Sequence, residues 1–143
     1  MAIALYFSGK ILRQLIMKEK PLIKHIGQLN EFVAGDKCFL REVFHPDRDA
    51  VKTGFSLAYA YVKPGGRTLD HYLEQSETYY IISGKGMMYL DDGAFEVESG
   101  HSYYVPAFCR QWIKNVGTDK LEFLVIVDPP WDKEQEHIAE DQS

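Results

Sequence analysis

The residues with the clearest chemical potential in this chain are a histidine and a glutamate in one glycine-bounded block and a glutamine in a second. The first block, residues 65–84, contains His71 and Glu77, and the second, residues 100–115, contains Gln111. An imidazole exchanges protons near neutral pH, so His71 is a candidate general base. A carboxylate that points into a barrel has to be paired, coordinated or protonated, because burying an isolated charge is unfavourable. The two side chains therefore indicate a functional pocket.

The elements that must position these side chains are short strands. After Pro21, apolar runs alternate with turn signals such as Lys63-Pro64-Gly65-Gly66, and no long segment has the helical period. The runs expected to be strands cover residues 55–62, 68–73, 78–82, 87–90, 94–97, 103–105, 111–114 and 121–127. The turn Asp91-Asp92-Gly93 predicts a hairpin. Short strands at spacings of about ten residues are typical of a β-sandwich or barrel.

Alternation along each strand sorts the candidate residues by face. Successive side chains point to opposite faces, so an inward His71 brings Leu73 inward, and an inward Glu77 brings Tyr79 inward. Gln111 shares its face with the apolar alternate positions of its own strand. The pattern predicts that the candidate residues converge on the barrel interior, and the alternative is a register that turns Glu77 outward.

Tyr59 is the second candidate catalytic residue. Tyr59 and His71 each lie six residues from Gly65, so a turn at residues 63–67 would place them opposite each other. We therefore expect Tyr59 and His71 to face one cavity.

Both blocks resemble the paired motifs of the cupins. The first fits the family pattern GX5HXHX3EX6G with Leu73 in place of the second histidine, and the second fits GX5PXGX2HX3N except at Phe108 and Gln111. The similarity extends from about Arg41 to Trp131 and is shared with small single-domain cupins of the sugar-phosphate-isomerase-like type. It implies an all-β fold, the double-stranded β-helix or jelly-roll barrel, which agrees with the strand pattern.

The resemblance also implies a metal centre. Cupins typically hold Mn, Fe, Ni, Zn or Cu through two histidines and a glutamate of the first motif and a histidine of the second. His71 and Glu77 keep their ligand positions, and Gln111 is left to offer its carboxamide oxygen, unless it is a structural amide. Leu73 cannot coordinate. One nitrogen and two oxygens favour Mn2+, Fe2+ or Mg2+, so the resemblance implies a divalent ion that is weakly bound or absent.

Three functions stay open. The first is a metal-dependent enzyme that acts on a small polar metabolite, a sugar derivative or a carboxylic acid, by isomerisation, decarboxylation, lyase chemistry or dioxygen insertion. The second is a metal-free isomerase or epimerase with His71 as general base and Tyr59 or Tyr79 as proton donor. The third is a non-catalytic barrel that binds a small molecule. The sequence does not choose among them, so whether the chain is an enzyme is left open.

Length and charge narrow the remaining classes. A chain of 143 residues has room for about one domain, expected at residues 25–131 between an N-terminal extension, 1–24, and an acidic tail, 132–143. The tail holds five acidic residues and one lysine out of a net charge of -5, so the body is close to neutral. We therefore expect no binding to nucleic acid, which requires clustered basic residues, and a solvated, frayed tail.

The cysteines, the N-terminus and the two-faced strands give the remaining expectations. Two cysteines are too few for a disulfide framework, which favours a cytoplasmic setting. Residues 1–20 are too short and too charged to span a membrane, and we expect a short amphipathic helix there, or a working chain that begins near Met17. Residues 79–82 and 121–126 are apolar on both faces, which predicts a homodimer formed through sheet faces.

Overall fold

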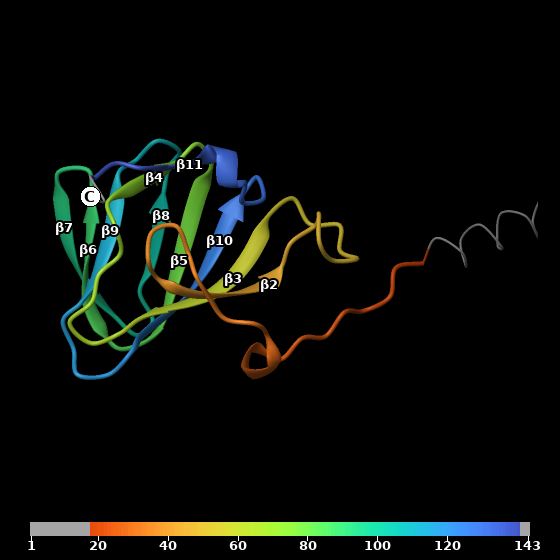
Figure 1. Ribbon diagram of the computed structural model, residues 1–143, viewed down its shortest axis with the longest axis horizontal. Coiled ribbons are helices and arrows are strands. Elements are labelled where there is room, and N and C mark those ends of the chain that lie inside the picture. The colour runs from red at the N-terminus through yellow and green to blue at the C-terminus, as the bar shows by residue number, and fades with distance from the viewer. Residues whose placement is uncertain (1–17, 141–143) are drawn as a thin grey trace, which may run out of the picture.

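The computed structural model describes residues 18–140, which form a barrel of two antiparallel β-sheets (Figure 1). The six-stranded sheet contains, in spatial order, β1 (Phe32–Val33), β2 (Phe39–Phe44), β3 (Ser56–Val62), β10 (Leu121–Asp128), β5 (Ser76–Ser83) and β8 (Ser102–Val105). The five-stranded sheet contains β11 (Glu136–Ile138), β4 (His71–Leu73), β9 (Gln111–Asn115), β6 (Lys85–Leu90) and β7 (Gly93–Glu98). This arrangement confirms the predicted all-β jelly-roll barrel.

Most of the expected strands form within a few residues of their predicted bounds. The predicted hairpin is present as β6 and β7, which pair from Lys85↔Glu98 to Leu90↔Gly93. The sequence analysis did not assign β1, β2 or β11. Strands β1 and β2 extend the six-stranded sheet at the edge next to β3, on the side away from β5.

The acidic segment after Trp131 is ordered, and the prediction that it is a frayed tail is wrong for residues 132–140. It forms the 3-10 turn η2 (Lys133–Gln135) and then β11, which pairs with β4. The His137 ring stacks on Tyr72 with ring centroids 4.9 Å apart, and the Glu140 carboxylate binds the Arg67 guanidinium through two hydrogen bonds of 3.0 and 2.9 Å. The segment is therefore held by contacts with the barrel, and its strand β11 covers the outer edge of β4.

The N-terminal part of the described chain has little regular structure. Residues 18–25 contain no helix or strand, and the 3-10 turn η1 (Ile26–Gln28) follows them. The short helix expected near residues 11–16, and the alternative start near Met17, lie outside the described residues. In the described part of the chain, no helix is long and apolar enough to cross a membrane.

The apolar core lies between the two sheets. Its buried members come from both sheets and comprise Cys38, Ala60, Val62, Tyr79, Ile81, Met88, Val97, Val105, Ile113, Leu121, Phe123 and Val125. Burial along β5 alternates, with Glu77, Tyr79 and Ile81 inside, and β9 alternates in the same way from Gln111 to Asn115. The inward register predicted for the two motif strands is therefore confirmed.

The motif turns require backbone conformations that favour glycine. Gly84, between β5 and β6, has a φ of 94°, and a Cβ there would lie 2.6 Å from the carbonyl oxygen of Lys120. Phe108 stands where the family pattern has glycine, yet its φ is 65°. The turn before β9 therefore keeps the left-handed conformation although the residue that adopts it most easily has been replaced.

Asn115, the last residue of the second motif, holds two loops to the barrel. Its side chain is 1% exposed. Its Nδ2 donates to the carbonyl oxygens of Val62, at 2.9 Å, and Asp119, at 2.8 Å, and its Oδ1 accepts from the Gly117 amide at 2.9 Å. The one side chain therefore satisfies three backbone groups, which explains why an asparagine ends this motif.

We predict that Asn115→Ala lowers the free energy of unfolding by about 2 to 3 kcal/mol, because buried carbonyl groups lose their donor. Urea denaturation followed by circular dichroism measures the change. The neighbouring Lys114→Ala, whose side chain is exposed, is the control and is expected to change stability by less than about 0.5 kcal/mol. Equal effects of the two substitutions would contradict a structural role for the Asn115 amide.

Candidate functional site

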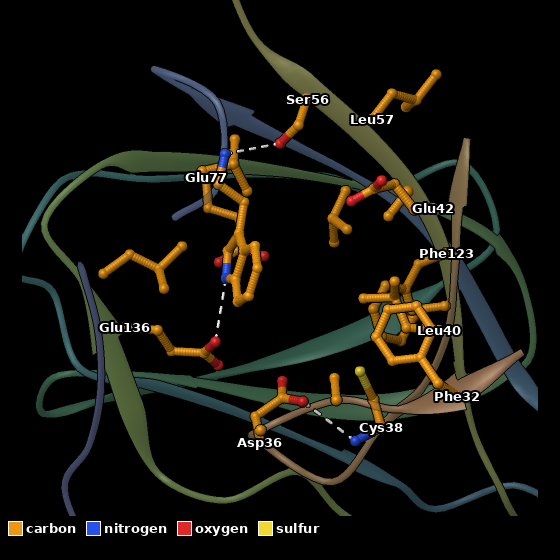
Figure 2. A pocket seen from close by; sticks show the side chains of 18 of the residues that line it. Phe32, Asp36, Cys38, Leu40, Glu42, Ser56, Leu57, Glu77, Phe123 and Glu136 are labelled. Carbon is orange, nitrogen blue, oxygen red and sulfur yellow. Dashed lines mark hydrogen bonds between the residues drawn. The ribbon is translucent and has the colours of Figure 1, made fainter. Parts of the chain in front are cut away.

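The candidate site is a cavity of about 170 Å3 lined by both sheets and by the C-terminal segment. Figure 2 looks into it, with Glu77 and Glu136 on one side and Leu40 and Phe123 on the other. Its titratable lining includes Asp36, His71, Glu77 and Glu136, and its apolar lining includes Val33, Leu40, Leu73, Phe123, Val125 and Trp131. The inner faces of β4 and β5 therefore open onto one mostly apolar chamber with several ionisable groups. Gln111 on β9 does not line this chamber, so the expectation that it shares the cavity with His71 and Glu77 is wrong.

His71 is fixed on β4 with one ring nitrogen free. Its side chain lines the cavity and the residue is 2% exposed. The Nδ1 hydrogen is donated to the carbonyl oxygen of Leu69 at 2.8 Å, so Nε2 is the nitrogen left to act, and it lies 3.7 Å from Asp36 Oδ2. Burial lowers the pKa of His71, but the charges of Asp36 and Glu77 and the bond to Leu69 outweigh it and raise the pKa overall.

Glu77 is directed into the cavity from β5 and is 7% exposed. Its Oε2 accepts a hydrogen bond of 3.0 Å from Gln111 Nε2. Burial is the largest cause that raises the pKa of Glu77, to about 7, and the charge of Asp36 adds to it, while His71 and the Gln111 hydrogen bond act in the opposite direction. The carboxyl group therefore changes protonation state near neutral pH.

Gln111 is held by two neighbours on the barrel interior. While its Nε2 donates to Glu77, its Oε1 accepts a 2.6 Å hydrogen bond from the Tyr79 hydroxyl. The prediction that Gln111 offers this oxygen to a metal is not supported, because the oxygen has a partner and the amino group faces Glu77. This arrangement matches the structural amide that was the alternative.

The family's metal set does not fit this donor arrangement. Leu73 lies buried on the cavity wall where the family pattern has a histidine, and it offers no donor atom. Among residues 18–140, no three histidine, cysteine, aspartate or glutamate side chains converge closely enough to hold a metal ion. The divalent ion that the resemblance implies stays a prediction.

Tyr59 does not share the cavity with His71, so this expectation is wrong. Tyr59 lies on β3 of the six-stranded sheet, whereas His71 lies on β4 of the other sheet. Its hydroxyl donates to Glu122 Oε1 on the outer face, where Tyr59 pairs across the ladder with Leu124. The chain between residues 62 and 71 crosses from one sheet to the other instead of forming a hairpin, so equal spacing from Gly65 does not make the two residues neighbours.

Three cavity residues were not predicted as site residues from the sequence, because they lie outside both blocks. Asp36 is in the turn between β1 and β2, where its Oδ1 accepts from the Cys38 amide at 3.1 Å. Trp131 and Glu136 follow β10, and the indole Nε1 donates to Glu136 Oε2 at 3.0 Å. The only sequence signal was the acidic composition of the segment that contains Glu136, and a carboxylate in such a segment is normally solvated. The pairing of this segment with β4 is what brings Glu136 to the cavity.

His45 fixes the position of Trp131. His45 is buried, and its Nε2 donates to the Trp131 carbonyl oxygen at 2.9 Å. The Trp131 amide donates to Ser56 Oγ at 2.9 Å, so the residue is tied to the barrel from both sides of its backbone. The indole is thereby held against Glu136 on the cavity wall.

Solved structures with the same fold share the barrel at low sequence identity. The polyketide cyclase RemF of Streptomyces resistomycificus superposes with a TM-score of 0.73 at 16% identity, covering 87% of this chain and 89% of that chain. The nucleoside dehydratase Pac13 of Streptomyces superposes with a TM-score of 0.69 at 18% identity, covering 87% and 95%. At these identities the likeness shows the fold alone.

Two proteins found by sequence similarity have a higher sequence identity to this chain than these solved structures do. An uncharacterized protein of Methanocaldococcus jannaschii is 36% identical over 115 residues, which are 79% of this chain and 90% of that protein. A glucose-6-phosphate isomerase of Thermococcus kodakarensis is 27% identical over 127 residues, which are 85% of this chain and 62% of that enzyme. The family model of the cupin domain matches residues 58–127, which contain both motif blocks. The chain therefore belongs to the cupin family.

Proposed function

We propose that the protein binds a small hydroxycarbonyl metabolite in the barrel cavity and isomerises it by proton transfer between His71 and Glu77. The observation that carries the proposal is the His71 ring, whose Nδ1 hydrogen is committed to the Leu69 carbonyl while Nε2 faces the cavity. In the neutral ring this tautomer places the basic lone pair on Nε2. His71 is therefore oriented as a general base before any substrate enters.

Glu77 supplies the complementary proton. Its carboxyl lines the same cavity, and its pKa, raised to about 7 chiefly by burial, leaves both protonation states accessible near neutral pH. The Gln111 amide, itself held by Tyr79, fixes the carboxyl group in position. Gln111 and Tyr79 thus act as positioning residues.

The proposed reaction is the interconversion of a ketose and an aldose. His71 Nε2 removes the proton from the carbon next to a carbonyl, the C–H electron pair forms the new C=C bond, and the carbonyl oxygen takes the Glu77 proton. The other enediol oxygen then returns a proton to Glu77, and the imidazolium returns its proton to carbon. Every proton is restored, so the isomer is the only product.

The similar proteins support a reaction of this kind without fixing it. A sequence relative is named a glucose-6-phosphate isomerase, and proteins of the same fold are named a cyclase and a nucleoside dehydratase, variants of which were solved with uridine. All of these names are those of enzymes that act on small molecules. The position of His71 and Glu77 on the lining of one cavity supports such chemistry here.

We predict that His71→Asn and Glu77→Gln each slow the enolisation of small sugars at least about 100-fold. The assay is solvent deuterium exchange into a panel of ketoses, aldoses and 2-oxo acids, followed by proton NMR. Asparagine keeps a polar side chain at position 71 but offers no basic nitrogen, and glutamine keeps the shape of Glu77 but has no acidic proton.

The matched control is His101→Asn, because the His101 side chain is 44% exposed and lies outside the cavity lining. Its exchange rate is expected to stay within about twofold of wild type. Exchange that vanishes after exhaustive chelation and returns with Mn2+ would contradict the proposal and favour the metal-dependent function. Equal loss in all three variants would also contradict it.

Stability should fall as pH rises through the titration of Glu77. The raised pKa means that the folded protein holds the Glu77 proton from about pH 4.5, the ordinary value, up to about pH 7. The folded state therefore binds more protons than the unfolded state in this window, and stability declines by up to about 3 kcal/mol across it. His71, whose pKa is also raised, adds a decline of the same sign.

Urea denaturation at pH 5 and pH 7.5 tests this expectation with Glu77→Gln, which cannot ionise. The loss of stability between the two pH values is expected to be smaller in Glu77→Gln than in wild type by about 2 to 3 kcal/mol. Glu96→Gln, at an exposed position of β7, should behave as wild type. Parallel pH profiles for all three proteins would show that Glu77 titrates as an ordinary carboxyl.

We also propose that the predicted homodimer forms through the outer face of the six-stranded sheet. Tyr80 and Ile82 on β5 and Ile126 on β10 are 49%, 38% and 36% exposed in the single chain. Tyr80 lies beside Leu124, and Ile126 beside Thr78, so the apolar side chains are contiguous. A second copy offers the same exposed apolar side chains, which suits a two-fold symmetric contact.

Light scattering at micromolar concentration tests this contact. The wild type is expected to have the mass of a dimer, and Tyr80→Glu combined with Ile126→Glu is expected to have that of a monomer, because a sheet contact does not accept buried unpaired carboxylates. Phe95→Glu is the control, since Phe95 is also 49% exposed but lies on β7 of the other sheet. A monomeric wild type would overturn the proposal.

A further inference from the structure

The cavity carries an excess of negative charge. Its lining contains three carboxylates that are not paired with a lysine or arginine, those of Asp36, Glu77 and Glu136. Arg48 also lines the cavity, but its guanidinium is held by Glu42 through two hydrogen bonds of 2.7 Å. The imidazole of a single histidine therefore faces three carboxylates.

Each of these carboxylates has one oxygen to spare. Asp36 Oδ1, Glu77 Oε2 and Glu136 Oε2 accept hydrogen bonds of 3.1, 3.0 and 3.0 Å from protein donors. The second oxygen of each accepts no hydrogen bond from the described residues. Among residues 18–140, Gln75 Oε1 is the only fully buried side-chain oxygen or nitrogen without a hydrogen-bond partner. The three free carboxylate oxygens are therefore not fully buried, and they remain accessible from the cavity.

The free groups point to a ligand, because buried polar groups are normally satisfied. Asp36 is 8% exposed, and His71 Nε2, which faces it at 3.7 Å, is too distant for a hydrogen bond. Carboxylates that are removed from bulk water and left without donors are unfavourable unless they take up a proton, which is why the pKa values of Glu77 and Glu136 are raised chiefly by burial, or a cation joins them. The cavity is therefore completed by a group that donates several hydrogen bonds and carries positive charge.

We propose that the cavity selects a ligand with a protonated amino group, which lies between the free oxygens of Asp36 and Glu136, and with an apolar body. The apolar body would lie against the rest of the lining, which includes Leu40, Phe123, Val125 and Trp131. The proposal rests on the use of the cavity as the ligand site in the proposed function, and it adds a protonated amino group to the hydroxycarbonyl substrate.

An ammonium group suits this spacing better than a metal ion does. Metal ions hold oxygen ligands at about 2.0 to 2.6 Å, which requires the donors to converge closely. An ammonium group donates three hydrogen bonds of about 2.7 to 2.9 Å, so it serves carboxylates that stand further apart. This agrees with the lack of a convergent donor set for a metal among residues 18–140.

Three probes of one shape test the charge preference. Benzylamine, benzyl alcohol and benzoate share a ring that suits the cavity of about 170 Å3, since an apolar cavity of about 150 Å3 holds benzene. Titration calorimetry on the full chain at pH 7.5 is expected to give benzylamine at least a tenfold lower Kd than benzyl alcohol, with benzoate weakest. Equal affinities, or a preference for benzoate, would overturn the proposal.

Two substitutions then locate the preference. Glu136→Gln and Asp36→Asn remove one charge each while keeping shape, and each is expected to raise the Kd of benzylamine at least fivefold and that of benzyl alcohol less than twofold. Glu96→Gln removes an exposed charge from β7 and is expected to change neither. A uniform loss of both probes in Glu136→Gln and Asp36→Asn would indicate damage to the fold, and thermal melting of each variant detects it. Such damage without selective loss overturns the assignment.

Two further outcomes separate this inference from the proposed function. Mn2+ that binds through Asp36 and Glu136, with no discrimination among the three probes, would assign the carboxylates to a metal ion and overturn the amine. Equal probe affinities together with deuterium exchange that depends on His71 would overturn the charge preference alone. Selective binding of benzylamine without any exchange would support the amine and remove the isomerase.

Discussion

A carboxylate inside an apolar barrel must have partners, and the arrangement around Glu77 follows from this constraint. One Glu77 oxygen is held by Gln111, and Gln111 is held in turn by the Tyr79 hydroxyl. This chain of hydrogen bonds joins β5 to β9, which belong to different sheets. The same hydrogen bonds therefore stabilise the buried carboxylate and link the two sheets. They do not fully offset the unfavourable burial of the charge, so the pKa of Glu77 is raised, mainly by burial.

The loss of two family histidines changed the kind of site and left the fold intact. Leu73 extends the apolar wall, and Gln111 replaces a metal ligand with an amide that donates to Glu77. Phe108 keeps the left-handed backbone of the glycine it replaces, with a φ of 65°. The family framework of turns and strands thus persists, because backbone hydrogen bonds and core packing maintain it independently of the metal ligands.

The C-terminal segment turns an open barrel end into an enclosed site. Strand β11 pairs with β4, directly beside His71, and brings Glu136 to the cavity. Trp131 reaches the same wall, held by His45 and Ser56, and its indole donates to Glu136. More than half of the ionisable lining comes from segments outside the two motif blocks, namely Asp36, Glu42, Arg48 and Glu136, and contacts over long sequence separations bring it to the cavity.

The sequence by itself determined the barrel, most of its strands and the inward direction of His71, Glu77 and Gln111. Each of these follows from local rules, since turn residues end strands and side chains alternate along them. Only the tertiary structure decided which residues share the cavity. Tyr59 faces outward because β3 and β4 lie in different sheets, and Glu136 faces inward because its strand pairs with β4. Sequence spacing fixes neighbours along a strand, whereas neighbours across a barrel depend on how distant strands pair.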